Sequence, residues 1–292
     1  MFRKLLTLGS LFLFVASFTN AQELAKDTSF WTKTLINTLT FSQTSFSNWS
    51  GGGDNALTLN GIIDYKLNYE KERSVWDNNL IMGYGINKTK DDGITKSDDR
   101  LEFSTKYGYS KSKKLKYSAL LDFKTQFAKG YDSDIDTLKV SNFMAPGYLS
   151  IGLGVDWRPK KWISIFASPL STKMTFVLDD ELSEKGSFGL DPGDRLRAEL
   201  GATVKAEMSK EIIKNVNVNS TLTLFSNYME KPQNVDVNWD TRVNMKINKY
   251  MSANFSLNMV YDDDVEIEDE NGHTRPILQI KEIFGIGLSA TF

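Results

Sequence analysis

The sequence predicts an all-β protein, a single transmembrane antiparallel β-barrel of about twelve strands. The clearest observation is the stretch from Leu115 to Phe127, where apolar side chains alternate with polar ones almost without exception. Side chains of a strand point alternately to its two faces, so one face meets an apolar medium and the other meets water or polar groups. The second observation is length, because the predicted strands run to roughly 11 to 14 residues whereas strands of soluble proteins average about five or six. The third is that the links between strands alternate between long and short.

The first residues are expected to be a signal peptide rather than part of the barrel. Arg3 and Lys4 precede an apolar run from Leu5 to Phe18, and small residues lead to a cleavage site near Ala21. The run is shorter than the ~20 residues that a spanning helix needs. The expected organisation is therefore a signal peptide at 1–21, a short periplasmic segment at 22–33 and an outer-membrane β-barrel at 34–292.

The first half of the barrel is predicted from period-2 alternation and turn signals. The second strand is the most regular, since its apolar face from Leu57 to Tyr69 carries no charge. The sixth alternates Leu149, Ile151 and Leu153 with serine and glycine. The six expected strands are 34–44, 57–69, 80–86, 101–109, 115–127 and 149–157.

The second half follows the same pattern with one interruption. Pro169 lies within the seventh strand, where it removes a backbone donor, so we expect a bulge or an edge distortion there. The eighth strand sets leucine, alanine and valine against arginine, lysine and glutamate. The expected strands are 162–178, 196–208, 216–228, 235–247, 253–261 and a last strand that ends at Phe292.

The links indicate which end of the barrel faces which compartment. Long, mostly acidic links alternate with short, mostly basic ones, which is the arrangement of long extracellular loops and short periplasmic turns. The expected long links are 46–55, 88–99, 129–146, 179–194, 230–234 and 262–276, and the short ones are 70–73, 111–114, 158–161, 209–214 and 248–250. Aromatic residues near the short links fit the interface between lipid and water: Trp76, Tyr109, Tyr117, Trp157, Trp162, Tyr250 and Phe292.

Composition narrows the function further. The chain has no cysteine, which removes disulfides, lipoprotein anchors and thiolate metal sites. The formal net charge is −2 and becomes −4 without Arg3 and Lys4, so nucleic-acid binding is not expected. A secreted all-β sandwich or closed barrel is the alternative, because alternation alone does not say which face is outside.

Several short motifs resemble a known family. They are the segment from Asn48 to Asn55 running into Leu57–Gly61, the segment from Met144 to Tyr148, and Ser168–Leu170 followed by Thr175–Val177. These motifs resemble the Bacteroidota barrel family called domain of unknown function 3078. The resemblance covers essentially the mature chain and implies an outer-membrane location in a didermal bacterium. The family has no agreed activity and implies no catalytic residue.

Motifs outside the strand pattern give weak chemical signals. His273 is the only histidine and lies in an acidic loop, a poor position for a Ser-His lipase, so we expect no enzyme and no cofactor. Asp132, Asp134 and Asp136 alternate and are weak calcium candidates without EF-hand spacing. Trp49, beside the glycines at 51–53, is a candidate contact for a protein partner.

The polar half of the strand pattern is the main candidate site. If the apolar faces meet lipid, the lumen is lined by Asp64, Lys66, Arg100, Glu102, Lys106, Asp122, Lys124, Asp156, Arg195, Arg197, Glu199, Lys205, Glu207, Asp236, Asp240, Arg242 and Lys246. Both signs of charge are interspersed, so these groups either line a narrow pore or close it by ion pairing. Inward glycines, among them Gly83 and Gly201, widen the space or admit a bulky neighbour.

The sequence thus favours a narrow channel or uptake barrel for small hydrophilic solutes, with the inward charges setting selectivity. The alternative is a non-conducting structural or accessory barrel of an outer-membrane assembly or secretion complex. A weaker alternative is a lipid-modifying enzyme. The expected partners are outer-membrane lipids, the barrel assembly machinery during insertion and another envelope protein, without nucleic acid.

Overall fold

The computed structural model describes residues 30–44, 56–89, 93–132, 138–268 and 273–291. The chain divides into two units, Met1–Phe30 and Trp31–Phe292. The second unit holds all the helices and strands given below. The expected signal peptide and the residues Trp49, Asp134 and Asp136 lie outside the described residues.

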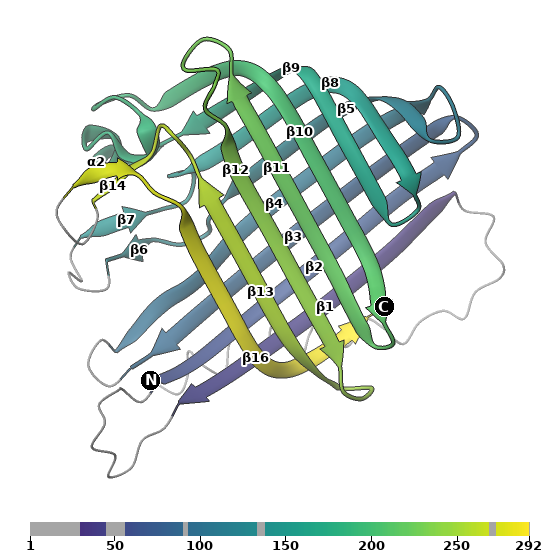
Figure 1. Ribbon diagram of the computed structural model, residues 1–292. Coiled ribbons are helices and arrows are strands. Elements are labelled where there is room, and N and C mark those ends of the chain that lie inside the picture. Colours follow the sequence, from purple (N-terminus) through teal and green to yellow (C-terminus); the bar gives the residue numbers. More distant parts are fainter. Residues whose placement is uncertain (1–29, 45–55, 90–92, 133–137, 269–272, 292) are drawn as a thin grey trace. The chain divides into compact units, whose positions relative to one another are not determined.

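Twelve of the described strands of the second unit form a closed ring in which each strand pairs antiparallel with its neighbours. Pairing of β1 with β16 closes the ring, from Ile36 opposite Thr291 to Phe41 opposite Ile286 (Figure 1). The prediction of a single twelve-stranded antiparallel barrel is therefore confirmed. The wall strands are β1 (Trp31–Thr44), β2 (Ala56–Lys71), β3 (Ser74–Lys88), β4 (Ile94–Ser110), β5 (Leu115–Thr125), β8 (Gly147–Lys160), β9 (Ile163–Phe176), β10 (Leu196–Ile213), β11 (Val216–Asn227), β12 (Asp236–Lys246), β13 (Met251–Tyr261) and β16 (Gln279–Thr291).

Short elements fold at one end of the barrel, in the long links (Figure 1). They are β6 (Gly130–Tyr131), β7 (Lys139–Ser141), α2 (Asp180–Glu184), η1 (Ser187–Gly189), β14 (Glu266–Glu268) and β15 (Thr274–Pro276). Ala145, Val177, Leu182 and Leu190 form a small buried apolar cluster with Phe188 packed against it. The long links from β5 to β8 and from β9 to β10 therefore share a core of their own, which the sequence pattern did not predict.

The bulge expected at Pro169 is confirmed. Four residues of β9, from Ala167 to Leu170, span the same length as the three residues of β8 from Leu153 to Val155, and the pairing with β10 shifts at the same place. A Cβ on Gly154 would lie 2.0 Å from the carbonyl oxygen of Ala167, so the close approach of β8 to the bulge requires glycine.

Two strand ends differ from the expectation. The link expected at 88–99 is mostly strand, because β4 begins at Ile94 and keeps pairing with β3 beyond a register shift at Gly85. The stretch from Leu115 to Phe127 ends as a strand at Thr125. Phe127 and Ala128 instead donate backbone hydrogen bonds to Asp99.

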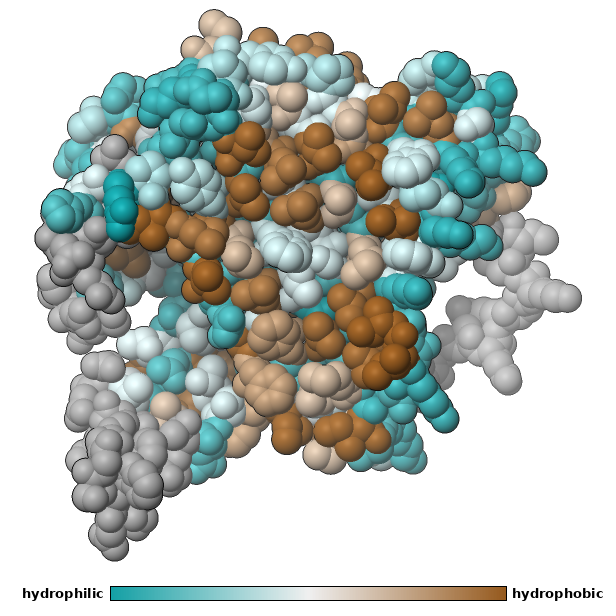
Figure 2. All heavy atoms as spheres, in the orientation of Figure 1, coloured by the Kyte–Doolittle hydropathy of each residue, from teal (hydrophilic) through white to brown (hydrophobic). Residues whose placement is uncertain are grey.

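The outer face of the wall is apolar. Large side chains such as Leu153, Leu200, Phe284 and Ile286 are exposed on it, and Figure 2 shows hydrophobic atoms gathered over the middle of the visible face with hydrophilic atoms towards both ends. Charged side chains are buried on the opposite face of the same strands. This inversion is typical of a barrel whose wall meets lipid. Within the described residues, no helix has the length and apolar character to span a membrane.

Exposed aromatic residues lie near the short turns. Trp31 packs against Tyr69 and Trp76, with ring centroids 5.0 and 5.9 Å apart, and Trp76 is exposed. Tyr109, Tyr117, Trp157 and Tyr250 are exposed in the same way at other strand ends. Such rings suit the interface between lipid and water.

Candidate functional site

The candidate site is the barrel lumen, and β4 shows how the sequence builds it. Even-numbered residues of β4 from Asp98 to Lys106 point inward because the strand alternates, whereas Phe103 and Tyr107 are exposed outside. On the neighbouring strand, a Cβ at Gly83 would lie 2.8 Å from Cγ of Arg100. Gly83 therefore leaves the space that the Arg100 side chain occupies.

A continuous chain of ion pairs crosses the lumen from β16 through β4 and β12 to β2. Arg100 contacts Asp98 at 3.2 Å and Asp240 at 3.2 Å. Arg242 contacts Asp240 at 3.2 Å and Asp64 at 3.0 Å. Lys281 contacts Asp98 at 2.5 Å at the other end. We call these six residues the cross-lumen chain, and its three cations balance its three carboxylates.

A second cluster joins β3, β4, β5, β8 and β10. Lys106 contacts Glu207 at 2.5 Å and Asp156 at 3.8 Å, and Lys205 contacts Asp122 at 2.7 Å. Asp156 also accepts a hydrogen bond from Arg158, which pairs with Asp77. Lys106 and Asp156 are buried, so this side of the lumen is filled by paired side chains.

A third cluster lies towards the long links. Lys173 contacts Asp236 at 2.6 Å and Asp262 at 2.8 Å, and Arg197 contacts Glu199 at 3.0 Å and Asp264 at 3.1 Å. Two cations therefore face four carboxylates, so the third cluster carries an acidic surplus. Arg197 also donates to the carbonyl oxygen of Gly189 at 2.7 Å, which connects the cluster to η1.

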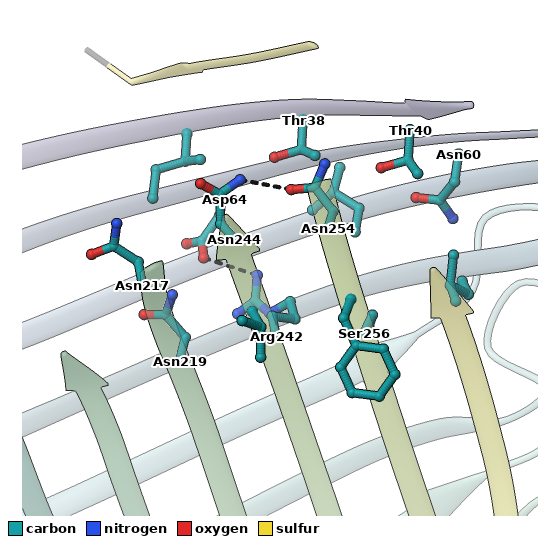
Figure 3. A pocket seen from close by; sticks show the side chains of 15 residues that line it. Thr38, Thr40, Asn60, Asp64, Asn217, Asn219, Arg242, Asn244, Asn254 and Ser256 are labelled. Carbon is teal, nitrogen blue, oxygen red and sulfur yellow. Dashed lines mark hydrogen bonds and ion pairs between the residues drawn. The ribbon is translucent and has the colours of Figure 1, made fainter. Parts of the chain in front are cut away.

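A polar cavity of about 230 Å³ remains beside the cross-lumen chain (Figure 3). Strands β1, β2, β11, β12, β13 and β16 line it with five asparagines and three threonine or serine side chains, beside the apolar Ile36, Ile62, Val243, Phe255 and Ile283. Asn244 donates to Asn254 at 2.6 Å, and Arg242 donates to Asp64 at 3.0 Å within it. The labelled residues are Thr38, Thr40, Asn60, Asp64, Asn217, Asn219, Arg242, Asn244, Asn254 and Ser256.

Comparison with family models identifies part of this wall. Residues 41–131 match the family described as Protein of unknown function (DUF3078). The expected family resemblance is confirmed over this segment. The matched residues run from the end of β1 through β2, β3, β4 and β5, and they include Arg100 and Asp64 of the cross-lumen chain.

Comparisons with individual proteins add little. No curated protein matches the sequence. Among solved structures, an outer membrane channel from Pseudomonas putida F1 has a TM-score of 0.42 at 9% identity, covering 94% of this chain and 100% of that one. The translocator domain of the autotransporter NalP from Neisseria meningitidis has a TM-score of 0.37 at 8% identity, covering 97% and 94%. TM-scores this low do not support assigning the activity of either protein to this chain.

The structure brings most of the expected lumen residues into contact with one another or with polar neighbours. The cross-lumen chain contains Asp64, Arg100, Asp240 and Arg242. The second cluster contains Lys106, Asp122, Asp156, Lys205 and Glu207. The third cluster contains Arg197, Glu199 and Asp236. Lys66 donates to Asn219 and Lys124 to Asn238, each at 3.3 Å, and Glu102 lies opposite Lys124 in register.

Two expected lumen residues lie elsewhere. Arg195 precedes β10, its side chain is 57% exposed, and it pairs with Asp180 of α2. Lys246 is the last residue of β12 and is exposed at the short-turn end. Alternation continues past both positions, but the strands end there.

Sequence reasoning missed several residues that complete the site. Asp98 fell within an expected loop, although Lys96, Asp98, Arg100 and Glu102 already alternate. Lys281 was missed because the last strand was predicted by its end alone, and β16 already begins at Gln279. The asparagines of the cavity were missed because no charge marked them.

The long links carry an ion pair outside the lumen. Lys139 of β7 donates to both carboxylate oxygens of Asp179 at 2.8 and 2.9 Å, and Asn142 donates to one of them. Burial acts to raise the pKa of Asp179, but these hydrogen bonds and one from the Leu182 backbone outweigh it and lower the pKa to about 2. Asp179 thereby holds β7 against the start of α2.

The other candidate motifs add no site. His273 is exposed between β14 and β15, and Asp132 follows β6. Among the residues that the structure describes, no three histidine, cysteine or acidic side chains gather in a way that would hold a metal ion. Trp49, Asp134 and Asp136 lie outside the residues that the structure describes.

Proposed function

We propose that this chain is an outer-membrane β-barrel that acts as a narrow channel for small hydrophilic solutes. The outer-membrane location is supported by the apolar outer wall, the polar lumen and the export signal expected at residues 1–21. The observation that carries the channel function is the polar cavity between β1–β2 and β11–β13, which lies within the lumen beside the cross-lumen chain.

The lumen favours slow, selective passage over wide diffusion. Inward charges are mutually neutralised in the cross-lumen chain, so the middle of the lumen offers no ring of one charge sign. The acidic surplus of the third cluster lies towards the long links and attracts cations weakly. A solute that passes must exchange its hydrogen bonds to water for hydrogen bonds to amide and hydroxyl groups of the lumen, rather than for contacts with a row of charged side chains.

A second candidate function is a non-conducting barrel that acts in an envelope assembly through its long links. The observation that favours it is that Arg100 and Asp240 meet across the lumen, while Lys106 and Glu207 close the space on one side. A barrel whose interior is filled by paired side chains has no open passage, so it can act as a structural scaffold. The folded core shared by the long links would then be the functional part.

Uptake into vesicles separates the two functions. Purified protein is reconstituted into liposomes, and the rate of swelling is measured in a size series of uncharged solutes, from glycerol through monosaccharides to a trisaccharide. The channel function predicts swelling with the smallest solutes and a steep decline with size. Rates equal to those of empty liposomes for every solute would favour the non-conducting barrel.

A further inference from the structure

The cavity beside the cross-lumen chain is lined by Asp64, one of whose carboxylate oxygens has no hydrogen-bond partner among the described residues. Asp64 is 3% exposed and lines the cavity. Its Oδ2 accepts from Arg242 at 3.0 Å, whereas its Oδ1 has no hydrogen-bond partner among the described residues. A buried charged acceptor that is left unsatisfied is costly, so a donor that a small rearrangement of the cavity wall brings to Asp64 would stabilise it.

The other groups around Asp64 define what that donor belongs to. Figure 3 shows Thr38, Asn244 and Asn254 around the same space. Amides and hydroxyls both donate and accept, so they match a ligand that carries several groups of both kinds. Neutral side chains from β1, β2, β11, β12 and β13 thus surround a single carboxylate edge.

Charge balance excludes a strongly charged ligand. Arg242 already neutralises Asp64, and the cross-lumen chain as a whole contains equal numbers of cations and carboxylates. A cation would be repelled by Arg242, and an anion by Asp64. The volume of about 230 Å³ lies below the ~300–1,000 Å³ of pockets for drug-sized ligands, so there is room for a small solute only.

We infer that this cavity is a binding site for a small uncharged polyhydroxylated solute of monosaccharide size, with Asp64 Oδ1 accepting a hydrogen bond from one of its hydroxyls. The site rests on the proposed channel function, since the solute reaches it through the lumen. It deepens that function by naming the solute class and the residue that selects it. Hydroxyl recognition by a carboxylate and amides gives orientation without requiring a net charge on the ligand.

Binding is measured without transport, by titration calorimetry of the full-length protein in detergent. The probes are glucose, galactose, myo-inositol and glycerol, with sodium chloride as a charged comparison. The site predicts saturable heat with at least one of the three larger probes and none with the salt. Asp64→Asn is expected to weaken that binding roughly ten-fold or more, because it replaces a charged acceptor.

Two threonines of β1 provide a matched pair of variants. Thr38→Val removes a hydroxyl from the cavity, leaves all ion pairs in place and should weaken binding. Thr34→Val makes the same change on the same strand outside the cavity lining and should leave binding unchanged. Retention of the folded barrel in each variant is checked by the change in gel mobility on boiling.

The outcomes separate this site from the channel function. Saturable binding that Asp64→Asn and Thr38→Val weaken supports the site, even if liposomes do not swell and the channel proposal fails. Swelling without saturable binding of any probe overturns the site and leaves the channel in place. Binding that is equal in wild type, Asp64→Asn and Thr38→Val also overturns it.

Discussion

Arg100 and Asp240 stand on β4 and β12, six strands apart in a ring of twelve, and their side chains meet at 3.2 Å. No greater separation is possible around this ring, so the contact spans the lumen. It divides the interior into a side filled by the second cluster and a side that contains the polar cavity. The lumen is therefore constricted by side chains, although twelve strands give it space.

Breaking the cross-lumen chain at one residue should destabilise the barrel. Arg100→Met leaves Asp240 with Arg242 alone and Asp98 with Lys281 alone, so one buried carboxylate of the chain is no longer balanced and the free energy of unfolding is expected to fall by ~3–5 kcal/mol. The double variant Arg100→Met/Asp240→Asn should lose less, because one uncompensated charge is removed. Urea titration in detergent, followed by tryptophan fluorescence, measures both.

The control for this prediction is a cation of the long links. Lys231 pairs with Asp263 at the surface, and its side chain is 56% exposed. Lys231→Met should cost under ~1 kcal/mol. An equal loss in Lys231→Met and Arg100→Met would contradict the structural role of the chain.

The lipid-facing wall makes a second prediction. Leu153 is 58% exposed in the middle of β8, so Leu153→Arg should lower the free energy of unfolding in lipid vesicles by ~2–4 kcal/mol. Leu178 is equally large and 50% exposed but lies beyond the end of β9. Leu178→Arg should cost under ~1 kcal/mol. Similar costs at both positions would mean that Leu153 meets water.

Ion selectivity tests the third cluster. Because its carboxylates outnumber its cations, the wild-type channel should favour cations slightly, and Arg197→Glu should increase that preference. Arg195→Glu changes the net charge of the chain by the same amount, but Arg195 lies outside the wall strands. Reversal potentials in a salt gradient should shift with the first variant and stay constant with the second. The opposite result would contradict the assignment of Arg197 to the lumen.

Acid should loosen the long links. The pKa of Asp179 is lowered from the ordinary 3.8 to about 2, so its carboxylate stabilises the folded links fully above about pH 4 and loses that effect as the pH falls towards 2. The protection of backbone amides against hydrogen exchange, relative to the intrinsic rate at each pH, should fall in 138–146 and 178–185 across this window. Asp179→Asn should show fast exchange at pH 6 already and little further change. Unchanged protection down to pH 2 in the wild type would contradict the assignment.

The wall was predictable because its signal is local. Alternation from Leu57 to Tyr69 or from Leu196 to Met208 assigns a face to every residue, and Pro169 correctly indicated the bulge. The contacts across the lumen were not predictable, because Arg100 and Asp240 are 140 residues apart in sequence. Alternation gives the side of the wall but not the height at which tilted strands from opposite sides meet.

The ends of the strands and the packing of the long links could not be predicted from the alternation. Arg195 and Lys246 keep the inward period of their strands, but Arg195 precedes β10 and Lys246 is the last residue of β12, so both side chains lie at the ends of the wall. The apolar cluster of Ala145, Val177 and Leu182 joins two links that are separate in sequence. Neither feature has a periodic signal.

Single-channel recording of wild type and of Arg100→Ser/Asp240→Ser in planar bilayers tests the central claim most directly. The account predicts small, discrete conductance steps for the wild type and steps larger by roughly two-fold or more for the double variant, since the contact that spans the lumen is gone. Silence of both proteins, each shown to be folded, would contradict a channel. Equal conductance of the two would contradict the claim that the Arg100–Asp240 pair constricts it.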